Sequence, residues 1–151
     1  AASGGSSSSV HAKYQQIVNS VGWQTQKAVS GRWDWACGAY CTAYARSFVD
    51  NRTRYESEFW HGNLAYWTGG WSRAVGSDAQ MLSAAKSSLD NGKPCVVTVN
   101  SSYGQHYVLA IYYTGSGTGT NDFVVIDPWN GQIKSLANYT LNYYNKQVVS
   151  F

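Results

Sequence analysis

Three residues of this chain, Cys37, His106 and Asp127, have the side chains that nucleophilic catalysis by a thiol requires. Apolar runs begin near His106 and end at Asp127, and the Gly-rich stretch between them predicts a β-hairpin. In such a hairpin, a histidine at the start of the first strand lies opposite an aspartate at the end of the second. We therefore expect the carboxylate to orient the imidazole, and the imidazole to activate the Cys37 thiol.

Each of these residues also has an ordinary structural explanation. A single histidine at a strand start is commonly a surface residue, and an aspartate followed by Pro128 commonly forms a turn. The combination is more informative, because His106 and Asp127 should meet and Cys37 opens a predicted helix. A thiol at a helix N-terminus, next to a protonated imidazole, is more reactive than an isolated thiol.

The helices that would position these residues follow from periodicity and capping signals. We predict a short helix from residue 10, extended chain after Gly22, and a helix over residues 37–50 with Cys37 at its start. A capping box at 77–80 predicts a helix that ends near Leu89, where an Asn-Gly pair follows. The segment from residue 51 to 75 is aromatic and irregular.

The second half of the chain is mainly strand. Strands are predicted over residues 95–99, 106–113, 122–126, 132–136 and 147–151, with a short helix near 141–145. Helices followed by an antiparallel sheet indicate an α+β fold. Such a fold would place a cleft between a helical half, which carries the cysteine, and a sheet half, which carries the histidine and aspartate.

Length and composition indicate one domain. We expect it over residues 10–151, after a flexible Ser/Gly linker or expression remnant at residues 1–9. Only 13% of the residues are charged and the net charge is +3, which is too little for a nucleic-acid surface. The low charge and the linker favour a secreted or cell-surface domain of a longer polypeptide. No apolar run is long enough to span a membrane.

The three cysteines cannot all pair, so at least one thiol is free. Cys37 and Cys41 lie one helical turn apart, and we predict that both are reduced. His11 and His61 are isolated, and no cluster has the spacing of zinc ligands. We therefore predict neither a metal nor a cofactor.

Four short segments carry a recognisable pattern: CGA at residues 37–39, LDNGKPCVV at 89–97, GQHYV at 104–108 and VIDPW at 125–129. In this order they resemble the C39-like group of papain-fold cysteine peptidases. The resemblance covers residues 33–136. It implies a papain-like fold and thiol peptidase chemistry, with Cys37 as nucleophile, His106 as base and Asp127 as orienter.

The chain departs from the papain pattern at the oxyanion glutamine, which is expected six residues before the nucleophile, where Gly31 stands. The role would fall to Gln24 or Gln26 on the preceding extended segment, of which Gln26 is nearer to Cys37 in the sequence. Loss of one oxyanion donor typically costs about 2.7–4 kcal/mol of transition-state stabilisation. Along the substrate cleft we expect Trp35, Gly104 and Trp129.

Two other functions stay open. The segments CTAYA at 41–45 and WHGN at 60–63 resemble the CHAP amidases, which cut peptidoglycan, although the Asp-Pro-Trp segment fits the C39-like group better. A non-catalytic module would instead keep Cys37 as a small buried hydrophobe and offer a platform for carbohydrate or peptide, formed by Trp33, Trp35, Trp60, Trp67 and Trp71. The substrate of an enzyme would be a peptide or protein, with cell-wall peptide as one candidate.

Overall fold

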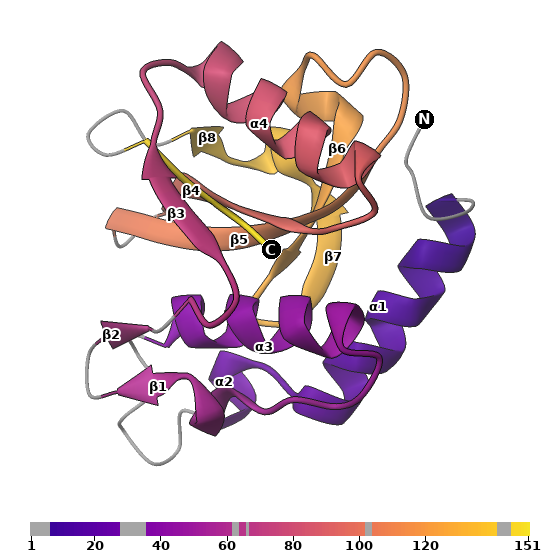
Figure 1. The fold of residues 1–151 in the computed structure, drawn as a ribbon, viewed down its shortest axis with the longest axis vertical. Helices are drawn as coiled ribbons and strands as arrows, with labels where there is room; N and C mark the ends of the chain where they lie inside the picture. Colours follow the sequence, from indigo (N-terminus) through magenta and orange to yellow (C-terminus); the bar gives the residue numbers. More distant parts are fainter. Residues whose placement is uncertain (1–6, 28–35, 62–63, 66, 102–103, 142–145) are drawn as a thin grey trace.

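The computed structural model describes residues 7–27, 36–61, 64–65, 67–101, 104–141 and 146–151 (Figure 1). The helices are α1 (Ser7–Val21), α2 (Gln24–Lys27), α3 (Cys37–Val49) and α4 (Asp78–Asp90). The strands are β1 (Trp60–His61), β2 (Leu64–Ala65), β3 (Trp71–Ala74), β4 (Cys95–Ser101), β5 (Gly104–Tyr113), β6 (Phe123–Asp127), β7 (Gln132–Ser135), β8 (Thr140–Leu141) and β9 (Gln147–Ser150).

An antiparallel sheet forms the centre of the fold. Seven strands of the described chain belong to it, in the order β3-β9-β4-β5-β6-β7, with β8 beside β4. The predicted hairpin is present as β5 and β6, in which Leu109 pairs with Ile126. The register shifts between Ala110 and Tyr112, so the hairpin contains a bulge. β1 and β2 form a separate small ribbon.

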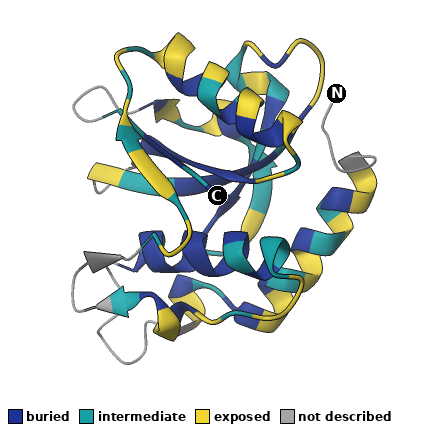
Figure 2. Ribbon diagram, viewed as in Figure 1, coloured by how far each residue is buried: buried dark blue, intermediate teal, exposed yellow. Residues whose placement is uncertain are grey.

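Helices cover both faces of this sheet (Figure 1). Along β5, Leu109 and Ile111 pack with the buried residues of α1 and α3, whereas Val108 and Ala110 pack with those of α4. This alternation follows from the two-residue period of a strand. The α+β class is therefore confirmed, but the division into a helical half and a sheet half is not complete, because α4 packs on the far face. Figure 2 shows the buried layers on either side of the sheet.

The helix boundaries agree with several of the sequence signals. α3 begins at Cys37, as predicted, and most of its residues are buried. Ser77 caps α4, because its side chain accepts a hydrogen bond from the backbone N–H of Gln80 at 3.2 Å. After α4, Gly92 has a φ of 77°, a left-handed conformation that glycine adopts without strain.

The N-terminal region differs from the sequence prediction. α1 begins at Ser7, so residues 7–9 form its first turn instead of a linker, and its buried face carries Val10 and Tyr14. Residues 24–27, predicted as extended, form the short helix α2. Its first N–H groups have partners outside the helix, since Gln24 N donates to Pro128 O at 2.9 Å and Thr25 N donates to Trp129 O at 2.8 Å.

Two other segments also differ. The sequence did not indicate a strand within residues 51–75, but β3 lies there and pairs with β9. Leu141 belongs to β8, which pairs with β4, and residues 142–145 of the predicted short helix lie outside the described residues. None of the described helices combines the length and apolar character needed to cross a bilayer.

Candidate active site

Cys37 is the first residue of α3 and is partly exposed. The preceding residue, Ala36, is buried, and its carbonyl accepts the first helical hydrogen bond, from Tyr40 N at 3.0 Å. One turn further on, the hydroxyl of Tyr44 donates to Gly22 O at 2.7 Å. The Tyr44 bond ties α3, and with it the thiol at its start, to the segment that follows α1.

His106 and Asp127 meet as the sequence predicts. His106 is the third residue of β5, and Asp127 is the last residue of β6. The imidazole Nε2 lies 2.8 Å from Asp127 Oδ1. The side chains are only 12% and 9% exposed, so solvent screens this pair weakly.

The surroundings of His106 favour its protonated form. Burial opposes the charge and would lower the pKa, but hydrogen bonds to Asp127 and Cys37, and the charges of both groups, raise the pKa of His106 to about 9. The Cys37 thiol therefore lies close enough to the imidazole to affect its charge. Asp127 lies at Nε2, so Nδ1 is the ring nitrogen left for another partner.

Asp127 is held as a carboxylate by several donors. Its Oδ1 accepts from Trp129 N at 2.9 Å as well as from His106, and its Oδ2 accepts from the hydroxyl of Tyr139 at 2.5 Å. The ammonium of Lys134 lies 3.9 Å from Oδ2. Burial would raise the pKa of Asp127, but its bond to His106, followed by those to Tyr139 and Trp129, keeps the pKa below its usual range.

Cys41 has a different environment from Cys37, although both lie on α3. It is fully buried, and its Sγ lies 3.6 Å from Tyr107 O, to which it donates. Burial, with smaller contributions from the charges of Cys37 and Asp127, raises the pKa of the Cys41 thiol far above its usual value. Burial also raises the pKa of Cys95 to about 12. All three cysteines are free thiols, and of these Cys37 is the one beside His106.

The two candidate oxyanion glutamines have opposite environments. Gln24 is buried, whereas Gln26 is exposed. The backbone of Gln24 bonds to Pro128, which follows Asp127 directly in the chain. Of the two glutamines, Gln24 is therefore the one that is enclosed by the fold, whereas Gln26 is the one nearer to Cys37 in the sequence. Gly31 lies outside the described residues.

Of the expected cleft residues, Trp129 is 38% exposed. Its backbone N–H donates to the Asp127 carboxylate, so it lies beside the proposed site. Gly104 is the first residue of β5, two positions before His106, with a φ of 110°. Trp35 lies outside the described residues, as does Trp33.

Tyr107, which the sequence did not single out, also lies near the thiol. Burial raises its pKa, and the charge of Cys37 raises it further. Trp67 packs edge-on against it, with 5.1 Å between the ring centroids. Trp60 packs against the core, and Trp71 is 66% exposed on β3. Of the three described members of the expected platform, Trp60 and Trp67 are therefore partly buried, and Trp71 is exposed.

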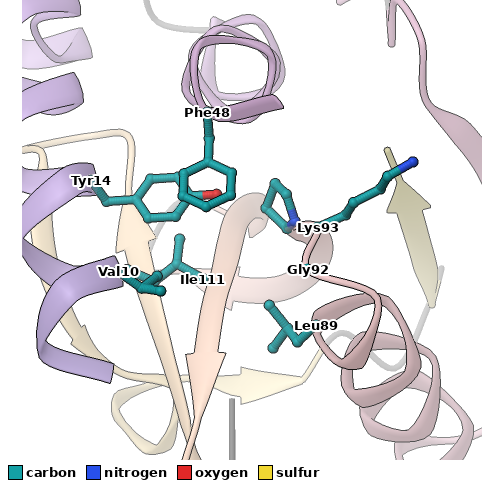
Figure 3. A pocket seen from close by; sticks show the side chains of 8 residues that line it. Val10, Tyr14, Phe48, Leu89, Gly92, Lys93 and Ile111 are labelled. Atoms are coloured by element: carbon teal, nitrogen blue, oxygen red, sulfur yellow. The ribbon is translucent and has the colours of Figure 1, made fainter. Parts of the chain in front are cut away.

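A small pocket lies elsewhere, between α1, α3 and the turn from α4 into β4 (Figure 3). Its lining is mainly apolar: Val10, Tyr14, Phe48, Leu89, Gly92, Lys93, Pro94 and Ile111. No candidate site residue is among these described lining residues. Within the described part of the chain, no group of three or more His, Cys, Asp or Glu side chains is placed to hold a metal ion.

Comparison with known families agrees with this geometry. The model of the Peptidase_C39 like family matches residues 4–149, nearly the whole chain, so the protein belongs to that family. The resemblance inferred from the four short segments is thereby confirmed, and the α+β architecture is that of a papain-like fold. Membership indicates a peptidase, of the cysteine type, with a protein substrate. No curated protein matches the chain.

Proposed function

We propose that the protein is a cysteine peptidase that hydrolyses peptide bonds, with Cys37 as nucleophile, His106 as general base and Asp127 as orienting residue. The main support is the contact of the His106 imidazole with Asp127, in which Nε2 lies 2.8 Å from Oδ1, together with the influence of Cys37, which helps to raise the pKa of the same ring. Family membership over residues 4–149 supports the same chemistry.

In the proposed reaction, the reactive form is an ion pair in which His106 keeps the proton as an imidazolium, and the Cys37 thiolate attacks the peptide carbonyl carbon. The imidazolium gives its proton to the leaving amine as the C–N bond breaks, which leaves a thioester on Cys37. Water then attacks the thioester, with His106 as base, and releases the acid and the free thiol. Asp127 keeps the proton of the ring on Nε2 and stabilises the imidazolium.

The oxyanion that forms during each attack needs donors. The backbone N–H of Cys37, at the open N-terminus of α3, is one candidate, because α3 has no side-chain cap. The Gln24 side chain is the other, since it is buried and its backbone is tied to Pro128 beside the catalytic aspartate. We propose Trp129 and Gly104 as residues along the substrate cleft.

The substrate that we propose is a peptide or protein, and cell-wall peptide is one member of that class. A CHAP-like reaction with Cys41 as nucleophile is disfavoured, because Cys41 is buried and its pKa is raised by that burial. The function of a purely aromatic binding module is disfavoured because Cys37 is partly exposed and lies near His106, whereas a passive hydrophobe would be buried.

Thiol alkylation coupled to peptide hydrolysis tests the proposal. The native protein is treated with iodoacetamide at pH 6, the modified cysteine is identified by mass spectrometry, and hydrolysis of a fluorogenic peptide mixture is followed in parallel. We expect modification at Cys37 alone and complete loss of hydrolysis in Cys37→Ala. Cys41→Ala is the matched control on the same helix and should keep most of its activity. An inert Cys37, together with no hydrolysis by the parent protein, would favour the binding module.

A further inference from the structure

We propose that Tyr139 is a positioning residue, which holds the Asp127 carboxylate and, through it, the His106 ring in the orientation needed for catalysis. The inference rests on the proposed function, because it adds a residue to the same site. Tyr139 follows Asp127 by 12 positions and lies outside the four short segments that the sequence analysis singled out.

The two oxygens of Asp127 have separate partners. Oδ1 faces His106 Nε2 at 2.8 Å and Trp129 N at 2.9 Å, whereas Oδ2 faces the Tyr139 hydroxyl at 2.5 Å. A carboxylate that is held through both oxygens cannot rotate about its χ2 angle without breaking at least one bond. The Tyr139 bond therefore sets the direction in which Oδ1 points at the imidazole.

The backbone around Tyr139 is itself well held. A turn of 3-10 helix, Leu136–Asn138, precedes it, and Tyr139 N donates to Leu136 O at 3.1 Å. Leu136 is fully buried in the core on the α4 side of the sheet. β8 follows directly, and its Leu141 pairs with Val99 of β4. The phenol thus extends toward Asp127 from a backbone that is anchored on both sides.

The phenol can act as a donor at every pH at which the enzyme could work. Burial raises the pKa of Tyr139 far above its usual value, and the bond and charge of Asp127 raise it further. Among the described residues, the other titratable groups that interact with Asp127 include His106, Lys134, Cys41 and Tyr44. Lys134 stays 3.9 Å from Oδ2 and lies 5.1 Å from the Tyr139 ring centroid, so it adds charge without replacing the hydrogen bond.

Tyr139→Phe tests this role, because it removes the hydroxyl and keeps the ring that packs against the core. We expect kcat to fall about tenfold with KM unchanged, the loss typical of one hydrogen bond to a charged group. The alkaline limb of the kcat profile should move to lower pH, and an NMR titration should show a lowered pKa of His106. Tyr113→Phe is the matched control, since Tyr113 donates to Asp90 Oδ1 at 2.5 Å in another part of the fold.

A double variant separates positioning from a general structural effect. If Tyr139 acts through Asp127, then Tyr139→Phe should cost little in an Asp127→Asn background. The inference would be overturned if the activity losses of Tyr139→Phe and Asp127→Asn added in full in the double variant. It would also be overturned if Tyr139→Phe kept the parent kcat and an unchanged His106 titration. If the parent protein shows neither hydrolysis nor alkylation at Cys37, the proposed function fails instead, and the His106 titration still reports whether Tyr139 holds the pair.

Discussion

The Nε2 atom of His106 lies 2.8 Å from Asp127 Oδ1, although the two residues are 21 positions apart in the chain. The hairpin of β5 and β6 produces this contact, because the pairing of Leu109 with Ile126 brings the start of one strand to the end of the other. Both side chains are largely buried, so each depends on the other for its charge.

Asp127→Asn should lower kcat by at least about tenfold, but by less than His106→Ala does. The amide oxygen can still accept from His106 Nε2, whereas the negative charge that stabilises the imidazolium is lost. The comparison requires kcat and KM for both variants, with thermal melting to show that each is folded. Full activity in Asp127→Asn would mean that the aspartate is only a turn residue.

Cys37→Ser should lower the pKa of His106 from its value of about 9, because the bond and charge of Cys37 are among the causes that raise it. An NMR titration of the imidazole measures this directly. Cys95→Ala is a suitable control, since Cys95 is buried among residues of the α4 side of the core. An unchanged His106 titration in Cys37→Ser would show that the thiol does not influence the imidazole.

In the parent enzyme, kcat/KM should fall as the pH rises through about 9, when the imidazolium is lost.

The same pair should make stability depend on pH with a definite sign. The pKa of His106 is raised from 6.5 to about 9 on folding, so its contribution is complete below pH 6.5 and is lost as the pH rises through about 9. The difference in melting temperature between the parent and His106→Gln should therefore shrink from pH 6 to pH 10. A difference that grows over this range would contradict the assignment of the pKa.

Much of the site could be predicted because the signals are local. Cys37 starts a helix with apolar residues at helical spacing, and the apolar runs on either side of a Gly-rich turn place His106 near Asp127. The helix cap formed by Ser77 and Gln80 could also be predicted from the sequence, since the two residues are three positions apart. In each case the partners lie within one helix or one hairpin, where spacing determines geometry.

The parts that were missed depend on distant contacts. α2 forms at residues whose first N–H groups bond to Pro128 and Trp129, about a hundred positions away, and no local pattern indicates this. Tyr139 reaches Asp127 only because a turn at Leu136–Asn138 redirects the chain. β3 is four residues long, largely exposed and paired with a strand at the C-terminal end, so neither length nor alternation identified it.

Ser77→Ala should destabilise the fold by about 1 kcal/mol, because it removes the side-chain oxygen that accepts from Gln80 N at the start of α4. Ser83→Ala is the matched control within the same helix, at an exposed position where alanine is the better helix former. Chemical denaturation of both variants gives the difference in unfolding free energy. Equal stability of the two variants would show that the cap contributes nothing.

Gln24→Ala should reduce kcat by about 10²- to 10³-fold with little change in KM, as expected for a donor that acts only in the transition state. Gln26→Ala should keep the parent rate, because the Gln26 side chain is exposed on the same short helix. The pair is well matched, since both changes remove one glutamine side chain from α2. Melting temperatures are needed for both, because Gln24 is buried and its loss also affects packing. Parent activity in a folded Gln24→Ala protein would mean that another group is the oxyanion donor. A loss of activity confined to Gln26→Ala would identify Gln26, the glutamine nearer to Cys37 in the sequence, as the donor.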